Sequence, residues 1–206
     1  MLETNEDPTH TFDYFGEELR YAYHLYNLTY LHERKVELAV AWHWMKRNTR
    51  GVGLEVGNVL GHYRPVTHRV VDKFERRAWY QTNISVDNVD LFDLTPKRDA
   101  VDWLVSISTI EHVGTDFPSN HTGLEALNHL RSLLKPGGRM LVTFPTGINP
   151  SLDEAVANET TGATRCATFV KHGKEMWTRP ETPVIQPYGE VDEWAGAVFI
   201  GEFGPL

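Results

Sequence analysis

The sequence predicts a doubly wound α/β fold, in which a mostly parallel sheet is covered by helices on both faces. After residue 51, short apolar segments alternate with helical ones, and parallel neighbours need crossover connections of this kind. The segment 103–107 is continuously apolar enough to be a strand buried on both faces. A chain of 206 residues fits one domain with a sizeable core. We therefore expect residues 1–206 to form a single domain.

Residues 1–50 are expected to form an N-terminal arm followed by helix. The first 16 residues carry Pro8, Gly16 and several acids without periodicity, which predicts an irregular arm. Residues 17–47 are predicted to be helical, because apolar residues recur along one face over 36–44. The polar run 47–51 then ends the helix.

Residues 51–145 are expected to contain the alternating core of the sheet. Strands are predicted at 52–56, 69–71, 84–86, 103–107 and 140–144, with a short turn or helix at 58–63. A helix is predicted at 123–134, because Thr122 and Glu125 are spaced as a capping box. The run 136–138, Pro-Gly-Gly, is expected to terminate this helix. In the C-terminal part, 146–206, we expect a helix at 152–157, strands at 167–170 and 197–200, and elements on the acceptor side.

Composition narrows the classes of function and the location. The chain has 20 Lys and Arg against 28 Asp and Glu, a formal charge of −8, so duplex nucleic acid is not an expected partner. The one cysteine, Cys166, excludes an internal disulfide and a multi-cysteine zinc site. An acidic start and the lack of a long apolar run predict a cytoplasmic protein with no membrane partner.

The residues that end the predicted strands are the main functional candidates, because ligands of open α/β sheets bind beyond the carboxyl ends of strands. Glu55, Gly57 and Gly61 follow the first strand, Asp72 the second and Asp90 the third. Asp72 suits the hydroxyl groups of a ribose, and Asp90 suits an adenine amino group. Each residue also has a simpler interpretation: a plain turn for Gly57, a helix cap for Asp72, and a solvated acidic loop for Asp90. Three acids at successive strand ends favour the functional interpretation.

In these motifs the chain resembles the class I S-adenosylmethionine-dependent methyltransferase family. The resemblance is carried by residues 54–57, 71–72, 90–91, 102–113 and 133–142. It implies a Rossmann-like sheet of seven strands with a final antiparallel strand. It also implies S-adenosylmethionine as the cofactor and S-adenosylhomocysteine as its product. The dinucleotide pattern Gly-x-Gly-x-x-Gly is missing after the first strand, so NAD is not expected.

The resemblance also implies a set of cofactor-binding residues. The loop from Glu55 to Gly61, with Gly57 and Asn58, would wrap the methionine end of the cofactor. The remaining members of the set are Asp72 at the ribose, Asp90 with Leu91 at the adenine, and Ser108 after the fourth strand. Val59 stands where many family members have a glycine, which puts the detailed path of the loop in doubt.

A narrower similarity points to bacterial sugar O-methyltransferases of polysaccharide synthesis, including the methylmannose type. It is carried by residues 27–38, 55–63, 71–75 and 106–114. It implies a sugar hydroxyl on a short, partly methylated oligosaccharide as the acceptor. Candidate substrate-binding residues are Tyr14, Tyr30 and Arg34. A homodimer remains an open alternative to a monomer.

Methyl transfer to an alcohol needs a positioned base, because the hydroxyl must lose its proton as the new bond forms. His112 follows the fourth strand and is the candidate base, and Glu111 would orient it or serve instead. The alternative is that His112 only caps the next helix. His24, His32 and His43 lie in the aromatic N-terminal stretch, where packing and a role in an acceptor pocket both remain open.

No metal is expected to be required, since no His-Glu-x-x-His motif or carboxylate cage is present in the sequence; magnesium is the first exception to consider. The competing class is a cofactor-binding module without catalysis. A phenolic or amine acceptor remains open. Amino-adenine and cytosine carbon-5 methylation are excluded, because Ser108–His112 is not an Asn/Asp-Pro-Pro-Tyr/Phe loop and Cys166 follows Arg165 rather than proline.

Overall fold

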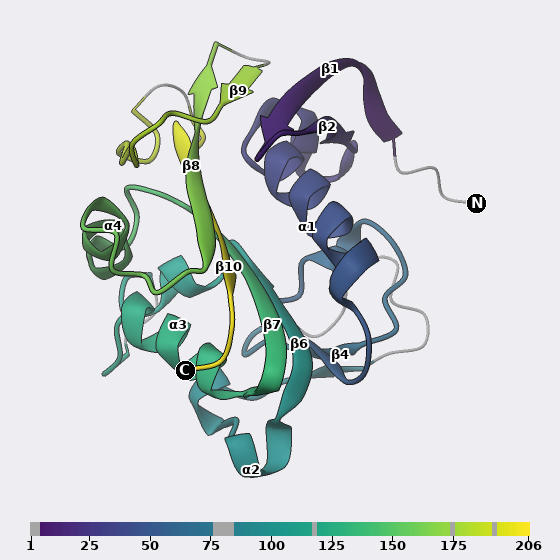
Figure 1. The fold of residues 1–206 in the computed structure, drawn as a ribbon, viewed down its shortest axis with the longest axis vertical. Coiled ribbons are helices and arrows are strands. Elements are labelled where there is room, and N and C mark those ends of the chain that lie inside the picture. The colour runs from purple at the N-terminus through teal and green to yellow at the C-terminus, as the bar shows by residue number, and fades with distance from the viewer. Residues whose placement is uncertain (1–4, 76–84, 117–118, 174–175, 191–192) are drawn as a thin grey trace.

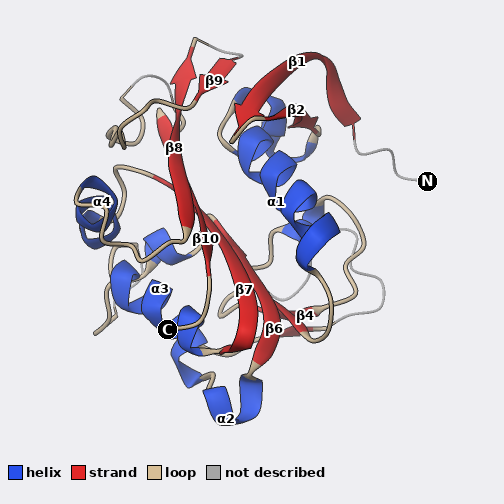
Figure 2. Cartoon of the chain, in the orientation of Figure 1, coloured by secondary structure: helices blue, strands red, loops and turns tan. Residues whose placement is uncertain are grey.

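The computed structural model describes residues 5–75, 85–116, 119–173, 176–190 and 193–206. The main sheet contains β3 (Gly53–Val56), β4 (Arg69–Val71), β5 (Val86–Asp87), β6 (Val101–Ile107), β7 (Leu134–Pro145), β8 (Arg165–His172), β9 (Met176–Thr178) and β10 (Ala197–Phe203). The helices are α1 (Arg34–Asn48), α2 (Pro96–Asp99), α3 (Gly123–Ser132) and α4 (Pro150–Ala157). Short 3-10 turns lie at Tyr26–Leu31, Leu60–His62, Leu91–Asp93 and Ile110–His112. Figure 2 shows how these elements alternate along the chain.

The eight strands are ordered β5-β4-β3-β6-β7-β10-β8-β9 (Figure 1). The first five in this order are parallel, and β10 runs antiparallel between β7 and β8. The predicted doubly wound α/β fold and its final antiparallel strand are therefore confirmed. The short strand β9 pairs with β8 and adds an eighth strand to the expected seven.

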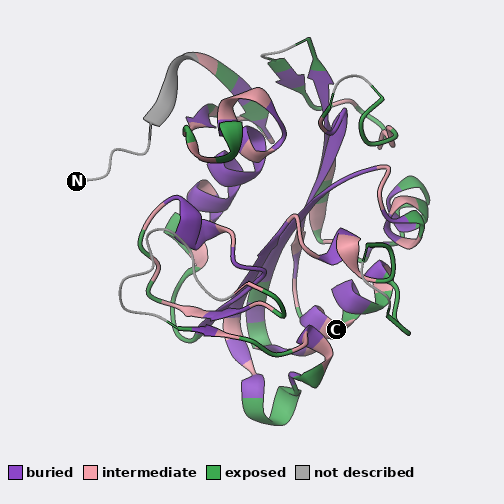
Figure 3. Ribbon diagram, turned by 180° about the vertical axis from the view of Figure 1, so that it is seen from behind, coloured by how far each residue is buried: buried purple, intermediate pink, exposed green. Residues whose placement is uncertain are grey.

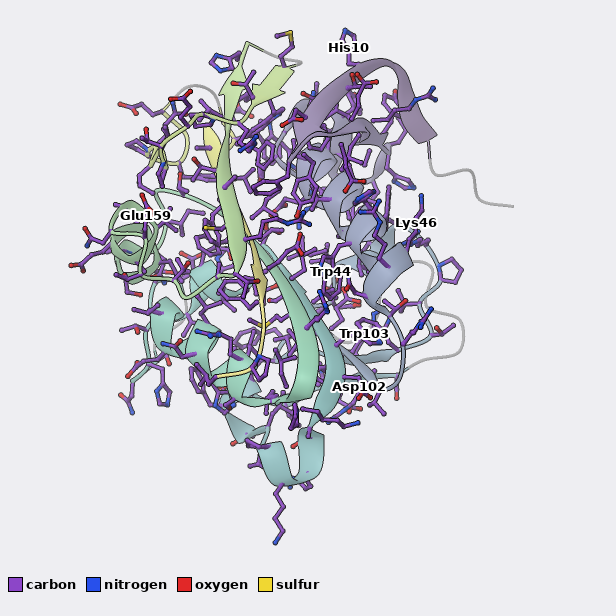
Figure 4. The ribbon with its side chains drawn as sticks, viewed as in Figure 1. His10, Trp44, Lys46, Asp102, Trp103 and Glu159 are labelled. Atoms are coloured by element: carbon purple, nitrogen blue, oxygen red, sulfur yellow. The ribbon has the colours of Figure 1, made fainter. Side chains whose placement is uncertain are left out.

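Two layers cover the sheet. Helix α1 lies against one face, and α3 and α4 lie against the other (Figure 1). The sheet contributes to both layers because side chains alternate along its strands: Trp103 packs in the core on the α1 side, and Leu104 packs in the core on the α3 side. Figure 4 shows Trp44 of α1 and Trp103 of β6, which belong to the same core cluster. The central strands are buried along most of their length (Figure 3).

The N-terminal region differs from both predictions made for it. Strands β1 (Asn5–Tyr14) and β2 (Glu17–Tyr23) form an antiparallel hairpin. The predicted irregular arm is therefore wrong for residues 5–14, and the helix predicted over 17–47 is wrong at its start, because α1 begins only at Arg34. The hairpin forms because Phe12, Tyr14 and Tyr21 become buried against α1 and β8–β9. This stabilisation comes from distant parts of the chain, so local periodicity does not reveal it.

The capping box of α3 is confirmed, since Thr122 Oγ1 accepts from the Glu125 amide and the Glu125 carboxylate accepts from the Thr122 amide. The helix ends at Ser132, two residues before the predicted end, because Leu134 joins β7 and pairs with Val101. The run 136–138 lies within β7 instead of ending the helix.

The predicted third strand appears as β5, although Ile84 lies outside the described residues. The strands predicted at 167–170 and 197–200 are present and longer.

Among the described residues, no helix is long and apolar enough to cross a membrane.

Candidate active site

A cavity of about 260 Å³ lies at the carboxyl ends of β3, β4, β5 and β6. Its walls come from the segments that directly follow these strands: residues 56–59, 71–75, 89–92, 108–109, 112–113 and 119. Most of the predicted cofactor-binding residues meet there, namely Gly57, Asn58, Asp72, Asp90, Leu91 and Ser108, together with the predicted base His112. This is the position at which open α/β sheets bind ligands.

The loop after β3 depends on glycine at position 57. Gly57 has φ +87°, a left-handed conformation, and a Cβ atom there would lie 1.9 Å from Thr109 Oγ1. Glu55 is fully buried, and its Oε1 accepts hydrogen bonds from the amides of Val59 (2.9 Å) and Leu60 (2.7 Å). Glu55 therefore shapes the loop from inside and does not line the cavity. Gly61 is likewise buried in the 60–62 turn, outside the lining.

Asp72 ties the ends of β3 and β4 together. Its Oδ1 accepts from the amides of Phe74 (2.9 Å) and Glu75 (2.7 Å), and its Oδ2 accepts from the Asn58 amide (3.0 Å). A carboxylate has about four acceptor positions, so about one remains for a ligand. Asp72 thus caps the segment that follows β4, as the simpler interpretation predicted, and it also lines the cavity.

Asp90 caps the 91–93 turn and lines the cavity. Its Oδ1 accepts from the Phe92 amide at 3.0 Å, and its Oδ2 lies 2.8 Å from Lys73 Nζ. Burial raises the pKa of Asp90, but the Lys73 ammonium and the Phe92 amide outweigh it and lower the pKa overall. Asp90 is therefore an ionised acceptor at the end of β5, next to Leu91.

His112 contacts a second acid besides Glu111, namely Asp116, which was not among the predicted site residues. Its Nδ1 lies 2.5 Å from Asp116 Oδ2, and its Nε2 lies 3.6 Å from Glu111 Oε1. A proton on Nδ1 that is donated to Asp116 leaves Nε2 as the basic nitrogen of the ring. The side chain of His112 is thus oriented by Asp116 within the cavity wall.

Behind this wall lies a buried group of charged residues, which we call the acidic cluster: Glu33, Arg34, Glu37 and Glu111. Ser108 Oγ, in the cavity wall, donates to the two carboxylate oxygens of Glu37 at 2.8 and 2.9 Å. Thr143 Oγ1 donates to the same carboxylate at 2.7 Å, and Arg34 Nη1 lies 3.2 Å from it. The N-terminal turns of α1 therefore bring charge to the ends of β6 and β7.

Glu111 differs from the other carboxyl groups of the cluster in its surroundings. Its side chain is 1% exposed, and neither carboxylate oxygen has a hydrogen-bond partner among the described residues. Burial, and then the nearby Glu37, raise the pKa of Glu111 well above its usual range, against the opposing effects of its own backbone amide and of Arg34. Burial also raises the pKa of Glu37. The surroundings of Glu111 therefore favour its neutral form over its ionised form.

None of the three predicted substrate-binding residues lines the cavity. Tyr14 is fully buried in the core, where its hydroxyl group donates to Glu202 Oε1 at 2.7 Å. Tyr30 stacks on Tyr23 with ring centroids 5.0 Å apart. The third, Arg34, lies in the acidic cluster behind the wall.

The N-terminal histidines contact neighbouring side chains and do not line the cavity. His32 stacks on Trp194 with ring centroids 4.2 Å apart, and His43 contacts Glu17 at 3.4 Å. Throughout the described ranges, no group of three or more His, Cys, Asp or Glu side chains is arranged to hold a metal ion.

Several site residues could have been found from the sequence, and others could not. Lys73, Phe74 and Glu75 directly follow Asp72, so the strand-end argument applies to them too. Glu33 and Glu37 carry a weaker signal: Glu33 directly precedes α1, and Glu37 lies in its first turn, next to apolar residues. Which strand ends these two acids approach depends on how α1 packs on the sheet, and this cannot be predicted from the sequence pattern.

No family model matches the chain, and no curated protein matches it in sequence. Among solved structures, the chain is similar to the N-methyltransferase NodS from Bradyrhizobium japonicum WM9 in complex with S-adenosyl-L-homocysteine. The TM-score is 0.52 and the identity 14%, over 83% of this chain and 86% of that one.

A second NodS structure gives a TM-score of 0.52 at 13% identity, over 84% of this chain and 97% of that one. The chain has the fold of this methyltransferase. A possible histamine N-methyltransferase from Thermotoga maritima is also similar, with a TM-score of 0.46 at 19% identity, over 86% of this chain and 92% of that one.

Proposed function

We propose that the protein is an S-adenosylmethionine-dependent methyltransferase. The observation that carries the proposal is the cavity, in which Gly57, Asp72, Asp90 and Leu91 meet at the ends of successive strands. Their types and order are those that the family resemblance implies for the cofactor. The fold shared with NodS, which was crystallised with S-adenosyl-L-homocysteine, supports the same conclusion.

The residues of the cavity fit such a cofactor. Val89, Leu91 and Phe92 give the end of β5 an apolar wall suited to an adenine ring, and Asp90 offers an acceptor for its amino group. The open acceptor position of Asp72 would receive a ribose hydroxyl. In the sheet, β3 and β6 come next after β5 and β4, whose ends would hold the adenine and the ribose. The methionine end of the cofactor and its reactive methyl group would therefore lie near Gly57, Ser108 and His112.

The cofactor supplies an activated methyl group, so this chain's own residues must orient the acceptor and accept its proton. In the proposal, Nε2 of His112 accepts the proton of the acceptor hydroxyl as the bond to carbon forms. Asp116 keeps the other ring nitrogen protonated and fixes the orientation of the ring. His112 is the catalytic base, and Asp116 is a positioning residue.

For the acceptor, we propose a sugar hydroxyl on a short, partly methylated oligosaccharide. The resemblance of segments 27–38 and 106–114 to those of sugar O-methyltransferases is one reason for this choice. Another is Phe74, an exposed aromatic side chain in the cavity wall. Aromatic faces suit the apolar faces of methylated sugars.

The test is transfer of labelled methyl groups from S-adenosylmethionine to a panel of mannosides, glucosides, phenols and amines. We expect turnover on an oligosaccharide and a methyl ether as the product. Turnover only on amines or phenols would contradict the proposed sugar acceptor but would still support the proposed methyltransferase activity. Binding of S-adenosylhomocysteine without transfer to any acceptor would favour a non-catalytic module.

A further inference from the structure

We infer that the acidic cluster makes the cavity favour a cationic ligand over a neutral one, and that Glu111 releases a proton when the cation binds. The inference rests on the proposed function, which supplies two ligands that differ in charge at one atom. S-adenosylmethionine carries a sulfonium, and S-adenosylhomocysteine carries a neutral thioether in its place. All other charged groups are the same in the two ligands.

The cluster holds more acid than base. Glu33, Glu37 and Glu111 are buried around a single guanidinium, that of Arg34, and His32 lies 3.5 Å from Glu33. Ionising all three carboxyl groups would bury charge without a counter-charge, which is costly in a protein interior. The cluster therefore keeps a proton unless a further cation comes near.

Glu111 is the group that keeps this proton. Arg34 contacts Glu37, and His32 contacts Glu33, whereas neither oxygen of Glu111 has a hydrogen-bond partner among the described residues. The charged and titratable groups around Glu111 are the other three members of the cluster, the neighbouring His112, and Tyr188 from the segment before β10. Burial and the carboxylates raise the pKa of Tyr188 to about 12, so its phenol adds no charge near neutral pH.

The cavity wall connects the cluster to the ligand. Ser108 belongs to the wall and donates to Glu37, and His112 belongs to the wall and lies 3.6 Å from Glu111. The two carboxyl groups are thus one layer of side chains behind the cavity. Electrostatic interactions act across such a distance in a poorly screened interior, so direct contact with the cation is not needed.

This arrangement has a consequence for turnover. A sulfonium bound near Ser108 and His112 would stabilise the ionised form of Glu111, and a thioether in its place would not. Glu111 would then take back a proton, and the product would lack the part of the donor's affinity that comes from charge. The cluster therefore favours exchange of product for fresh donor.

Proton release can be counted by calorimetry on the wild-type chain. Each ligand is titrated separately, without acceptor, at pH 7 in phosphate and in Tris, two buffers with different ionisation enthalpies. We expect S-adenosylmethionine to release more protons than S-adenosylhomocysteine, by up to about one per chain, because one carboxyl group changes state. We also expect it to bind about tenfold more tightly.

The variant Glu111→Gln keeps the shape of the neutral carboxyl group and cannot ionise. It should abolish the difference in proton release and lower the preference for S-adenosylmethionine by about tenfold. Its affinity for S-adenosylhomocysteine should stay close to that of the wild type, which also shows that the variant is folded. The control is Glu154→Gln, an exposed carboxylate on α4, which should behave like the wild type.

Equal proton release by the two ligands in the wild type would overturn the inference, whatever the variants do. Binding of both ligands with equal release leaves the proposed function intact. Binding of neither ligand would instead contradict the proposed function itself.

Discussion

His112 and Asp116 form the contact on which the proposed proton transfer depends, with 2.5 Å between Nδ1 and Oδ2. General-base assistance is worth about 10²–10⁴-fold, so His112→Ala should lower kcat by that order with little change in S-adenosylhomocysteine affinity. Asp116→Asn should cause a smaller loss, because the base remains but its tautomer is no longer fixed. Steady-state kinetics at saturating cofactor measure both effects, with the exposed Asp93→Asn as control. Normal turnover in His112→Ala would assign the base to another group.

Gly57 and Gly137 offer a matched pair of substitutions. Both have a left-handed backbone, with φ +87° and +79°, but only at position 57 would a Cβ atom meet Thr109. Gly57→Ala should lower the free energy of unfolding by about 1–3 kcal/mol and weaken cofactor binding, since the loop must move. Gly137→Ala should show backbone strain alone, with unchanged cofactor binding. Denaturant unfolding and calorimetry distinguish the two, and equal cofactor affinity in both variants would contradict the role assigned to the loop.

At the scale of elements, the β1–β2 hairpin is attached to the main sheet through Tyr21, whose hydroxyl oxygen accepts from the Trp177 amide at 2.7 Å. Tyr21→Phe leaves this buried amide without its acceptor and should lower the free energy of unfolding by about 1–3 kcal/mol. Tyr23→Phe is the control, because its ring stacks on Tyr30 nearer the surface. Urea unfolding measures the difference, and equal stability of the two variants would contradict docking of the hairpin on β9.

The elements predicted correctly are those whose signals are local. Strands β3, β4 and β6 and helix α3 follow from apolar runs and a capping box, and the strand-end residues follow because parallel strands end at one edge. The hairpin was not predicted, since Phe12 and Tyr14 become buried only through contacts with α1 and β8. The acidic cluster was not predicted for the same reason: its members become neighbours only when α1 docks on the sheet.

At the scale of the whole molecule, Glu111 links stability to pH. Its pKa is raised in the folded state, so the folded protein keeps a proton that the unfolded chain has lost. Its contribution to stability is therefore complete below the usual glutamate range and is lost as the pH rises through the folded pKa.

The Glu111→Gln variant lacks this loss, so its stability relative to the wild type should improve as the pH rises from 4 towards 8, by at most about 1.4 kcal/mol per pH unit. Urea unfolding over this range tests the prediction, with Glu154→Gln as control. A constant difference at all pH values would contradict a raised pKa at Glu111.

The central claim is that the cavity beyond β3–β6 binds S-adenosylmethionine and its product. Titration of S-adenosylhomocysteine into the wild type and into Asp90→Ala, followed by calorimetry, tests it most directly. We predict one binding site per chain, a raised Tm, no binding of NAD, and an affinity at least about tenfold weaker in Asp90→Ala, since a hydrogen bond to a charged acceptor is lost. An absence of heat and of any change in Tm at saturating S-adenosylhomocysteine would contradict the account.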